Sequence, residues 1–100
     1  MIYLTQLIYI HEGQQDIFHQ FEDVALPLLD KYQGKLLLRI RPSQGQVIAG
    51  ELESPYEVHL VSFPSQAAFD GFKQDKERER FLHLKDASVR KVVLIQGMSL

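Results

Sequence analysis

The feature that most constrains this chain is a set of strand-like stretches that are apolar on both faces. In residues 2–10, alternate positions place isoleucine and leucine around Gln6 on one face, and leucine and two tyrosines around Thr5 on the other. Residues 35–41 and 89–96 also carry apolar side chains at consecutive positions. A strand with one face in water normally alternates between apolar and polar residues. These stretches therefore predict a sheet that is covered on both sides.

The segment after the first strand has the spacing of an amphipathic helix. Apolar residues recur every three or four positions through residues 14–32. Pro27 lies inside this pattern, and proline removes a backbone hydrogen bond and clashes with the preceding turn. We therefore expect a kink or a break at Pro27 and an end to the helix at Gly34, since glycine is common just past a helix end.

A second helix is predicted to follow the strand that ends at Phe63. Pro64 ends this strand, because proline cannot donate to a sheet, and Ser65 is a suitable N-cap for the helix. Residues 73–80 are almost wholly charged and are expected to form a solvated helix face with a bend near Asp75. The last strand then begins near residue 89.

The predicted order of elements is β-α-β-β-α-β, in a single domain spanning residues 1–100. Two split βαβ units of this kind give an α+β, ferredoxin-like fold, with a four-stranded antiparallel sheet and both helices on one face. Residues 42–56 are expected to form a loop, in which residues 47–49 could extend the hairpin. Two helices cover one face only, so we expect a second copy of the chain to cover the other face as a homodimer.

Composition excludes several classes of function. The chain has 100 residues, a net charge of −2 and no cysteine. The near-neutral charge argues against a nucleic-acid partner, which needs a clustered basic face. We expect no signal peptide and no membrane partner, because there is no basic leader and no apolar run of about 20 residues. The absence of cysteine fits a cytoplasmic protein.

Two segments resemble a family of short, uncharacterised proteins, or domains of unknown function, of the dimeric α/β-barrel type. They are residues 57–68, with the sequence EVHLVSFPSQAA, and residues 25–35, with the sequence ALPLLDKYQGK. Residues 81–97 are compatible with the closing helix and strand of that family. Where the family usually has two glycines after the tyrosine, this chain has Gln33 and Gly34. The resemblance implies a ferredoxin-like homodimer whose sheets pack face to face, and it implies little about activity.

His59 is the first candidate for chemistry, because it interrupts an apolar strand predicted to neighbour the first strand. An imidazole that faces a cleft can act as a general acid or base near neutral pH. The alternative is a buried or edge histidine whose ring is satisfied by a neighbouring group.

Four further residues are candidates for ligand binding. Arg39 and Arg41 share one face of the second strand and could hold an anionic group such as a carboxylate. Their alternative role is to protect a sheet edge from pairing. Tyr3 and Thr5 lie together on the first strand and could line an apolar cavity, or they could serve core and interface packing.

The sequence indicates neither a metal nor a cofactor. His11, Glu12 and His19 lie near the first turn, but their spacing matches no helical histidine pair. There is no glycine-rich phosphate loop.

Two hypotheses remain. The first is a homodimer that binds a small apolar or anionic molecule in a cleft between sheet and helices. The second is a cofactor-free enzyme, similar to a monooxygenase or an isomerase, with His59 as the proton shuttle and Arg39 or a tyrosine steadying an oxyanion. They differ in whether His59, Arg39 and Tyr3 point into one pocket.

Overall fold

The computed structural model describes residues 1–99 and contains one four-stranded antiparallel sheet. The strands are β1 (Ile2–Ile10), β2 (Lys35–Ile40), β3 (Glu57–Phe63) and β4 (Val89–Gly97), and their order across the sheet is β2-β3-β1-β4. The two strands that are central in the sheet, β1 and β3, are also its most buried. This order and pairing confirm the predicted ferredoxin-like topology.

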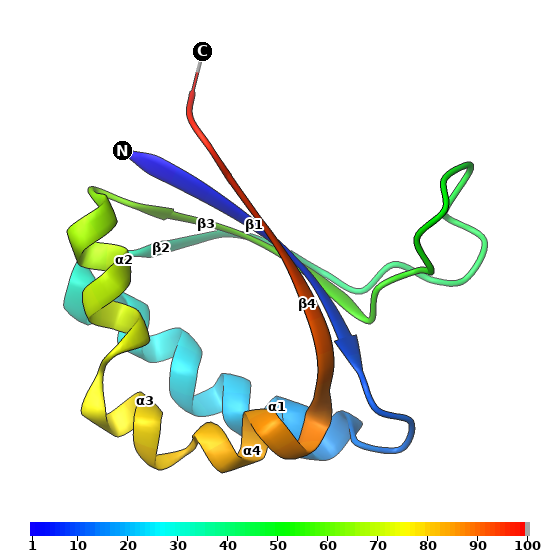
Figure 1. The fold of residues 1–100 in the computed structure, drawn as a ribbon, viewed down its shortest axis with the longest axis horizontal. Helices are drawn as coiled ribbons and strands as arrows, with labels where there is room; N and C mark the ends of the chain where they lie inside the picture. Colours follow the sequence, from blue (N-terminus) through cyan, green and yellow to red (C-terminus); the bar gives the residue numbers. More distant parts are fainter. Residues whose placement is uncertain (100) are drawn as a thin grey trace.

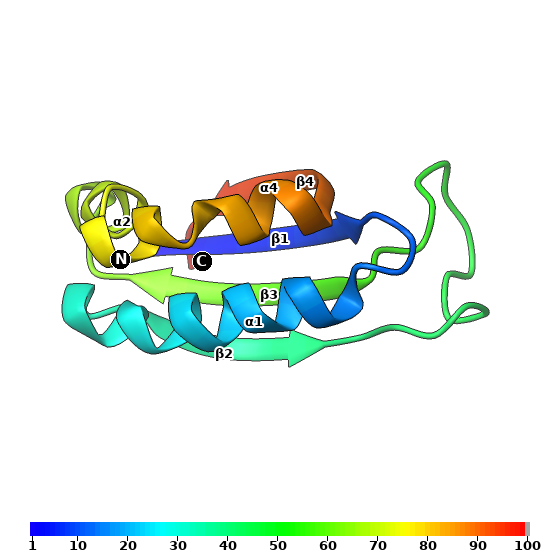
Figure 2. The same cartoon turned by 90° about the horizontal axis from the view of Figure 1, so that it is seen from below.

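All helices lie on one side of the sheet, as the sequence predicted (Figure 1). They are α1 (Gln15–Ala25), the 3₁₀ helix η1 (Leu26–Tyr32), α2 (Gln66–Lys73), α3 (Lys76–Arg80) and α4 (Leu82–Ser88). Figure 2 shows them as two rows across the sheet, with α1 and η1 over β2 and β3, and α4 over β1 and β4. No helix within residues 1–99 is long and apolar enough to cross a membrane.

The break expected at Pro27 is confirmed, because α1 ends at Ala25 and the chain continues as η1 with Pro27 in its first turn. The prediction that Gly34 ends the helix needs correction. The left-handed position is Gln33, with φ 58°. Gly34 is needed for a different reason: a Cβ there would lie 2.8 Å from Cε1 of Phe63.

The second helical segment is divided into three short helices, with the expected bend at Asp75. Ser65 caps α2 as predicted, since its Oγ accepts from the backbone N–H of Ala68 at 3.1 Å. The Asp75 carboxylate caps α3 by accepting from the N–H of Arg78 at 3.0 Å. The same carboxylate accepts from Lys31 Nζ at 2.6 Å and from the Tyr32 hydroxyl at 2.5 Å, so it ties α3 to η1.

The helix-facing side of the sheet carries the core. Alternate residues of the central strands point toward the helices, and they are buried together with side chains from η1 and α2. The members of this cluster are Leu4, Leu29, Val61, Phe63 and Phe69.

The opposite face of the sheet carries apolar residues that no helix covers. The strand register aligns Leu38, Leu60, Thr5 and Ile95 in one row across the sheet, and Ile40, Val58, Leu7 and Val93 in the next. Leu38, Ile40 and Ile95 are 46%, 44% and 53% exposed. The expectation that both faces of the strands are apolar is confirmed.

The segment between β2 and β3 has no strand of its own, so the extension of the hairpin at residues 47–49 did not form. Figure 1 shows this loop projecting beyond the end of the sheet. It returns to the sheet at its C-terminal end, where the Tyr9 hydroxyl donates to the Glu53 carbonyl at 3.0 Å. The N–H of Tyr56 also donates to the Ile8 carbonyl at 2.8 Å.

Candidate functional site

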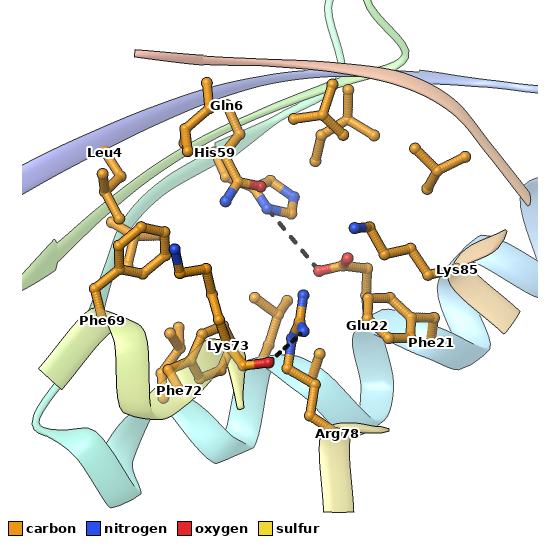
Figure 3. Close-up of a pocket in the computed structure, with 18 of the residues that line it drawn as sticks. Leu4, Gln6, Phe21, Glu22, His59, Phe69, Phe72, Lys73, Arg78 and Lys85 are labelled. Carbon is orange, nitrogen blue, oxygen red and sulfur yellow. Dashed lines mark hydrogen bonds and ion pairs between the residues drawn. The ribbon is translucent and has the colours of Figure 1, made fainter. Parts of the chain in front are cut away.

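A cavity of about 270 Å³ lies between the sheet and the helices. Its walls are mostly apolar side chains from β1, β3, α1 and α2, and its few polar groups include His59, Glu22 and Gln6 (Figure 3). The lining also includes Val92 and Leu94 of β4, which are 37% and 47% exposed. The cavity therefore reaches the surface beside this edge strand.

Glu57 and His59 are neighbours on the helix-facing side of β3, because residues two apart on a strand share a face. His59 Nε2 lies 2.6 Å from Glu57 Oε1, and both side chains are buried. Glu57 also accepts from Arg39, at 2.7 and 3.1 Å, and from Arg41, at 2.6 Å. One buried carboxylate thus accepts hydrogen bonds from three side chains.

This arrangement keeps Glu57 ionised. Burial alone would raise its pKa, but the hydrogen bonds from His59, Arg39 and Arg41 outweigh burial and lower the pKa to about 2. An ionised carboxylate can only accept, so His59 Nε2 must carry the proton that it shares with Glu57. In a neutral imidazole the other nitrogen, Nδ1, is then free to accept a proton.

Glu22 lies on the other side of His59. It comes from the apolar face of α1, and its Oε2 lies 3.9 Å from His59 Nδ1 across the cavity (Figure 3). Burial raises the pKa of Glu22, although the charges of His59 and Arg39 partly oppose this effect. The pKa values of the two carboxyl groups that flank His59 are thus shifted in opposite directions: that of Glu57 is lowered and that of Glu22 is raised. Such a divergence is typical of an acid–base pair.

Gln6 completes the polar part of the cavity on the sheet side. It pairs with His59 in the β1–β3 register, and both side chains line the cavity. Figure 3 shows the amide of Gln6 next to the imidazole. An amide in this position can donate to, or accept from, a bound molecule.

The structure does not bring the predicted site residues together. His59 lines the cavity, whereas Arg39 and Arg41 are paired with Glu57 and do not line it. Tyr3 and Thr5 belong to the opposite face of the sheet, where Thr5 pairs with Leu60 and Ile95. The trio of His59, Arg39 and Tyr3 therefore does not form one pocket.

The histidines near the first turn have other surroundings. His11 and Glu12 are exposed. His19 Nε2 lies 2.7 Å from the Tyr56 hydroxyl, and the two rings stack. Within residues 1–99, no group of three or more histidine or acidic side chains is placed to hold a metal ion.

Sequence reasoning missed Glu57 and Glu22, although both left a signal. Glu57 precedes His59 by two positions on a strand, the spacing at which side chains share a face. Glu22 follows Phe18 by four residues and precedes Ala25 by three, so it lies on the apolar stripe of α1. Arg78 was also missed, because it lies in a charged segment that was predicted to be solvated, and it is in fact partly buried against the cavity.

Comparison with known proteins gives similarity of structure only. No family model matches the sequence, and no curated protein matches it. A protein of unknown function from Rhodopseudomonas palustris superposes with a TM-score of 0.84 and 18% identity, over 99% of this chain and 82% of that one. A dimeric ferredoxin-like protein of unknown function from Jannaschia sp. CCS1 gives a TM-score of 0.71 and 16% identity, over 98% of each chain.

A third similar structure is described as an antibiotic biosynthesis monooxygenase. It superposes with a TM-score of 0.72 and 14% identity, over all of this chain and 99% of its own. At these identities the comparisons support the fold and leave the activity open. The chain has a ferredoxin-like fold, as the sequence predicted, and it shares this fold with a dimeric ferredoxin-like protein and with a protein described as belonging to the dabb family.

Proposed function

We propose that this protein binds a small, largely apolar molecule in the cavity between the sheet and the helices. The supporting observation is the cavity itself, which has a volume of about 270 Å³, apolar walls and a few polar groups near His59. Small-molecule sites usually combine an apolar lining with a small number of placed polar groups. The cavity opens beside β4, which gives a ligand a route of entry.

Binding of 2-naphthamide, an uncharged two-ring probe, tests this proposal. We expect calorimetric titration to detect binding to the wild-type protein. Val92→Trp places a large side chain in the cavity wall and should weaken binding by about tenfold or more. Val47→Trp, in the exposed loop, is the matched control and should bind like the wild type. The proposal is wrong if the wild-type protein does not bind the probe, or if both variants bind it equally well.

We further propose that the protein is a homodimer through the uncovered face of the sheet. The exposed apolar rows on that face support this, because soluble monomers rarely leave large contiguous apolar patches in water. One of the similar structures is described as dimeric. Sedimentation equilibrium should find two copies of the wild-type chain.

A charge in the centre of this face should separate the copies. Leu60→Asp is therefore expected to sediment as a single copy, or to unfold, and circular dichroism separates these two results. Ile48→Asp, on a side chain that is 98% exposed in the loop, is the control and should stay dimeric. A single folded copy of the wild-type chain would contradict the proposal.

A second candidate function is cofactor-free acid–base catalysis at His59. The observation that favours it is the row of Glu57, His59 and Glu22. Glu57 holds the imidazole with Nδ1 toward the cavity and stabilises the imidazolium that forms when Nδ1 takes a proton. Glu22, whose pKa burial raises, can hold the exchanged proton on the other side.

Ring opening of 5-nitrobenzisoxazole measures such a base without knowledge of the natural substrate. A base removes the proton from the ring carbon, the N–O bond breaks, and a coloured nitrophenolate is released. We expect the wild-type protein to accelerate this reaction, and His59→Gln to remove most of the acceleration. His83→Gln is the control, since His83 is exposed and does not line the cavity. Equal rates for both variants would rule out His59 as the base.

A further inference from the structure

The charged groups that line the cavity are unequally distributed. Three cationic side chains, Lys73, Arg78 and Lys85, face it together with one carboxylate, that of Glu22. Burial raises the pKa of Glu22, and the charges of His59, Arg39 and Arg78 partly oppose this effect. The cavity is therefore apolar in its walls and positive in its charge.

Several contacts with the fold hold Arg78 in place. Its backbone N–H donates to Asp75, and its Nη1 donates to the Lys73 carbonyl at 3.2 Å. The carbon at the centre of its guanidinium lies 5.2 Å from the centre of the Phe72 ring and 5.7 Å from that of Phe21. These contacts fix the guanidinium against the helix side of the cavity (Figure 3).

Arg78 nevertheless has unused donors. Its Nε is buried and has no hydrogen-bond partner within residues 1–99, and no carboxylate in that range forms an ion pair with it. The other half-buried guanidinium near the site behaves differently, because Arg39 makes two hydrogen bonds to Glu57. Nε is too buried for a ligand to reach. Nη2 also has no hydrogen-bond partner within residues 1–99, and it is not buried, so this donor of a fixed guanidinium is free to pair with a carboxylate.

We infer that the molecule bound in the cavity is an apolar carboxylate whose anionic group pairs with Arg78. This inference rests on the proposed ligand cavity and specifies the class of ligand. The carboxylate lies on the helix side, between α1 and α3, and the apolar body extends toward the sheet and His59. Lys85 adds positive charge next to Glu22 (Figure 3). The Lys73 ammonium is less available to a ligand, since it already forms an ion pair with Asp70 at 3.4 Å.

The sequence pointed to a different anion site. Arg39 and Arg41 were the candidates for holding a carboxylate, and both bind the protein's own Glu57. A ligand carboxylate there would have to displace a buried, ionised side chain that already has three donors. Arg78 forms no ion pair with a carboxylate within residues 1–99, although the charge of Glu22 acts on it across the cavity.

The test compares 2-naphthoate with 2-naphthamide, which have the same size and shape and differ in charge. The wild-type protein should bind the carboxylate about tenfold or more tightly than the amide, because a charge-assisted hydrogen bond is stronger than a neutral one. Arg78→Gln should remove this preference, because it should weaken binding of the carboxylate much more than binding of the amide. Arg80→Gln, on an exposed residue of the same short helix that does not line the cavity, should keep the preference.

The outcomes separate this inference from the proposal that it rests on. Binding of both probes with equal affinity to the wild-type protein would overturn the carboxylate inference and leave the cavity as an apolar binding site. Binding of neither probe would overturn both. If Arg78 served only to pack between Phe21 and Phe72, its replacement would weaken both probes alike. A preference that survives in Arg78→Gln would assign the carboxylate to another cation of the cavity and overturn the pairing with Arg78. If that variant fails to fold, the wild-type comparison still decides whether the cavity prefers a carboxylate.

Discussion

Replacing Glu57 by glutamine tests the electrostatic account of the site most directly. Glutamine keeps the size of the side chain but removes the charge that Arg39, Arg41 and His59 share. Lowering the pKa of a buried carboxyl from 4.5 to about 2 corresponds to about 3 kcal/mol of stability at neutral pH, at about 1.4 kcal/mol for each unit of pKa. Removing one partner of a buried ion pair costs about 3–5 kcal/mol in other proteins. We therefore expect Glu57→Gln to lower the free energy of unfolding by about 3 kcal/mol at pH 7.

The same cause fixes how this loss depends on pH. The folded pKa of Glu57 is lower than its unfolded value, so its contribution is complete above pH 4.5 and disappears as the pH falls toward about 2. By this relation, the difference in the free energy of unfolding between the wild type and Glu57→Gln falls from about 3 kcal/mol at pH 7 to about 2 kcal/mol at pH 3.5. Urea unfolding, followed by circular dichroism at one fixed protein concentration, measures this difference at each pH.

Glu53→Gln is the matched control. Glu53 pairs with Arg90 at the surface, where the two side chains are 54% and 42% exposed. Exposed ion pairs contribute about 0–1 kcal/mol, so this variant should unfold close to the wild type at every pH. A loss below about 1 kcal/mol for Glu57→Gln at pH 7, or a loss that stays constant down to pH 3.5, would refute the reasoning.

Three further predictions concern the scaffold, and urea unfolding measures each. Gly34→Ala should lower the free energy of unfolding by about 1–3 kcal/mol, because the Cβ of the alanine would lie 2.8 Å from the Phe63 ring. An unchanged midpoint of the urea unfolding curve would show that the core can adjust to the added methyl group. Gln33→Gly should raise stability by up to about 1 kcal/mol, because φ is 58° at this position and glycine adopts such angles without strain; a loss would contradict this. Ser65→Ala should lower the free energy of unfolding by about 1 kcal/mol because it removes the N-cap of α2, and Ser65→Asn should keep the wild-type stability because asparagine can also cap a helix. An equal loss of stability in both variants would argue against a capping role.

The fold could be predicted because its signals are local. Strand periodicity, the proline at the end of β3 and the apolar stripe of α1 each act over a few residues, and together they define the order of elements. The uncovered sheet face followed from the same periodicity. The bend near Asp75 was foreseen, but the second break in this segment, at Phe81 between α3 and α4, was not.

The site could be predicted only in part, because its groups meet in three dimensions. His59 was identifiable as a polar residue in an apolar strand. Glu57 could not be identified as the partner of Arg39, since contacts between side chains on two different strands depend on the register of those strands. Arg78 could not be distinguished from its charged neighbours, because its burial depends on how α3 turns after the cap at Asp75.

An irregularity in β2 determines which side of the sheet Arg39 occupies. The register pairs Leu36 with Val61 on the helix-facing side, but Leu38 pairs with Leu60 on the opposite side. A regular strand would keep Leu36 and Leu38 on one face, so the shift between them inserts one extra residue and changes the alternation. Beyond this bulge Arg39 pairs with His59 and reaches Glu57.

The bulge also accounts for the apolar residues on the other face. Without it, the register would pair Arg39 with Val58 on the uncovered face, and a charge would interrupt the surface proposed to meet a second copy. With it, Leu38 and Ile40 extend that surface, and the charge that holds Glu57 ionised lies on the helix side. One extra residue in an edge strand thus serves two purposes: it keeps the uncovered face apolar, and it supplies the arginine that maintains the buried carboxylate next to His59.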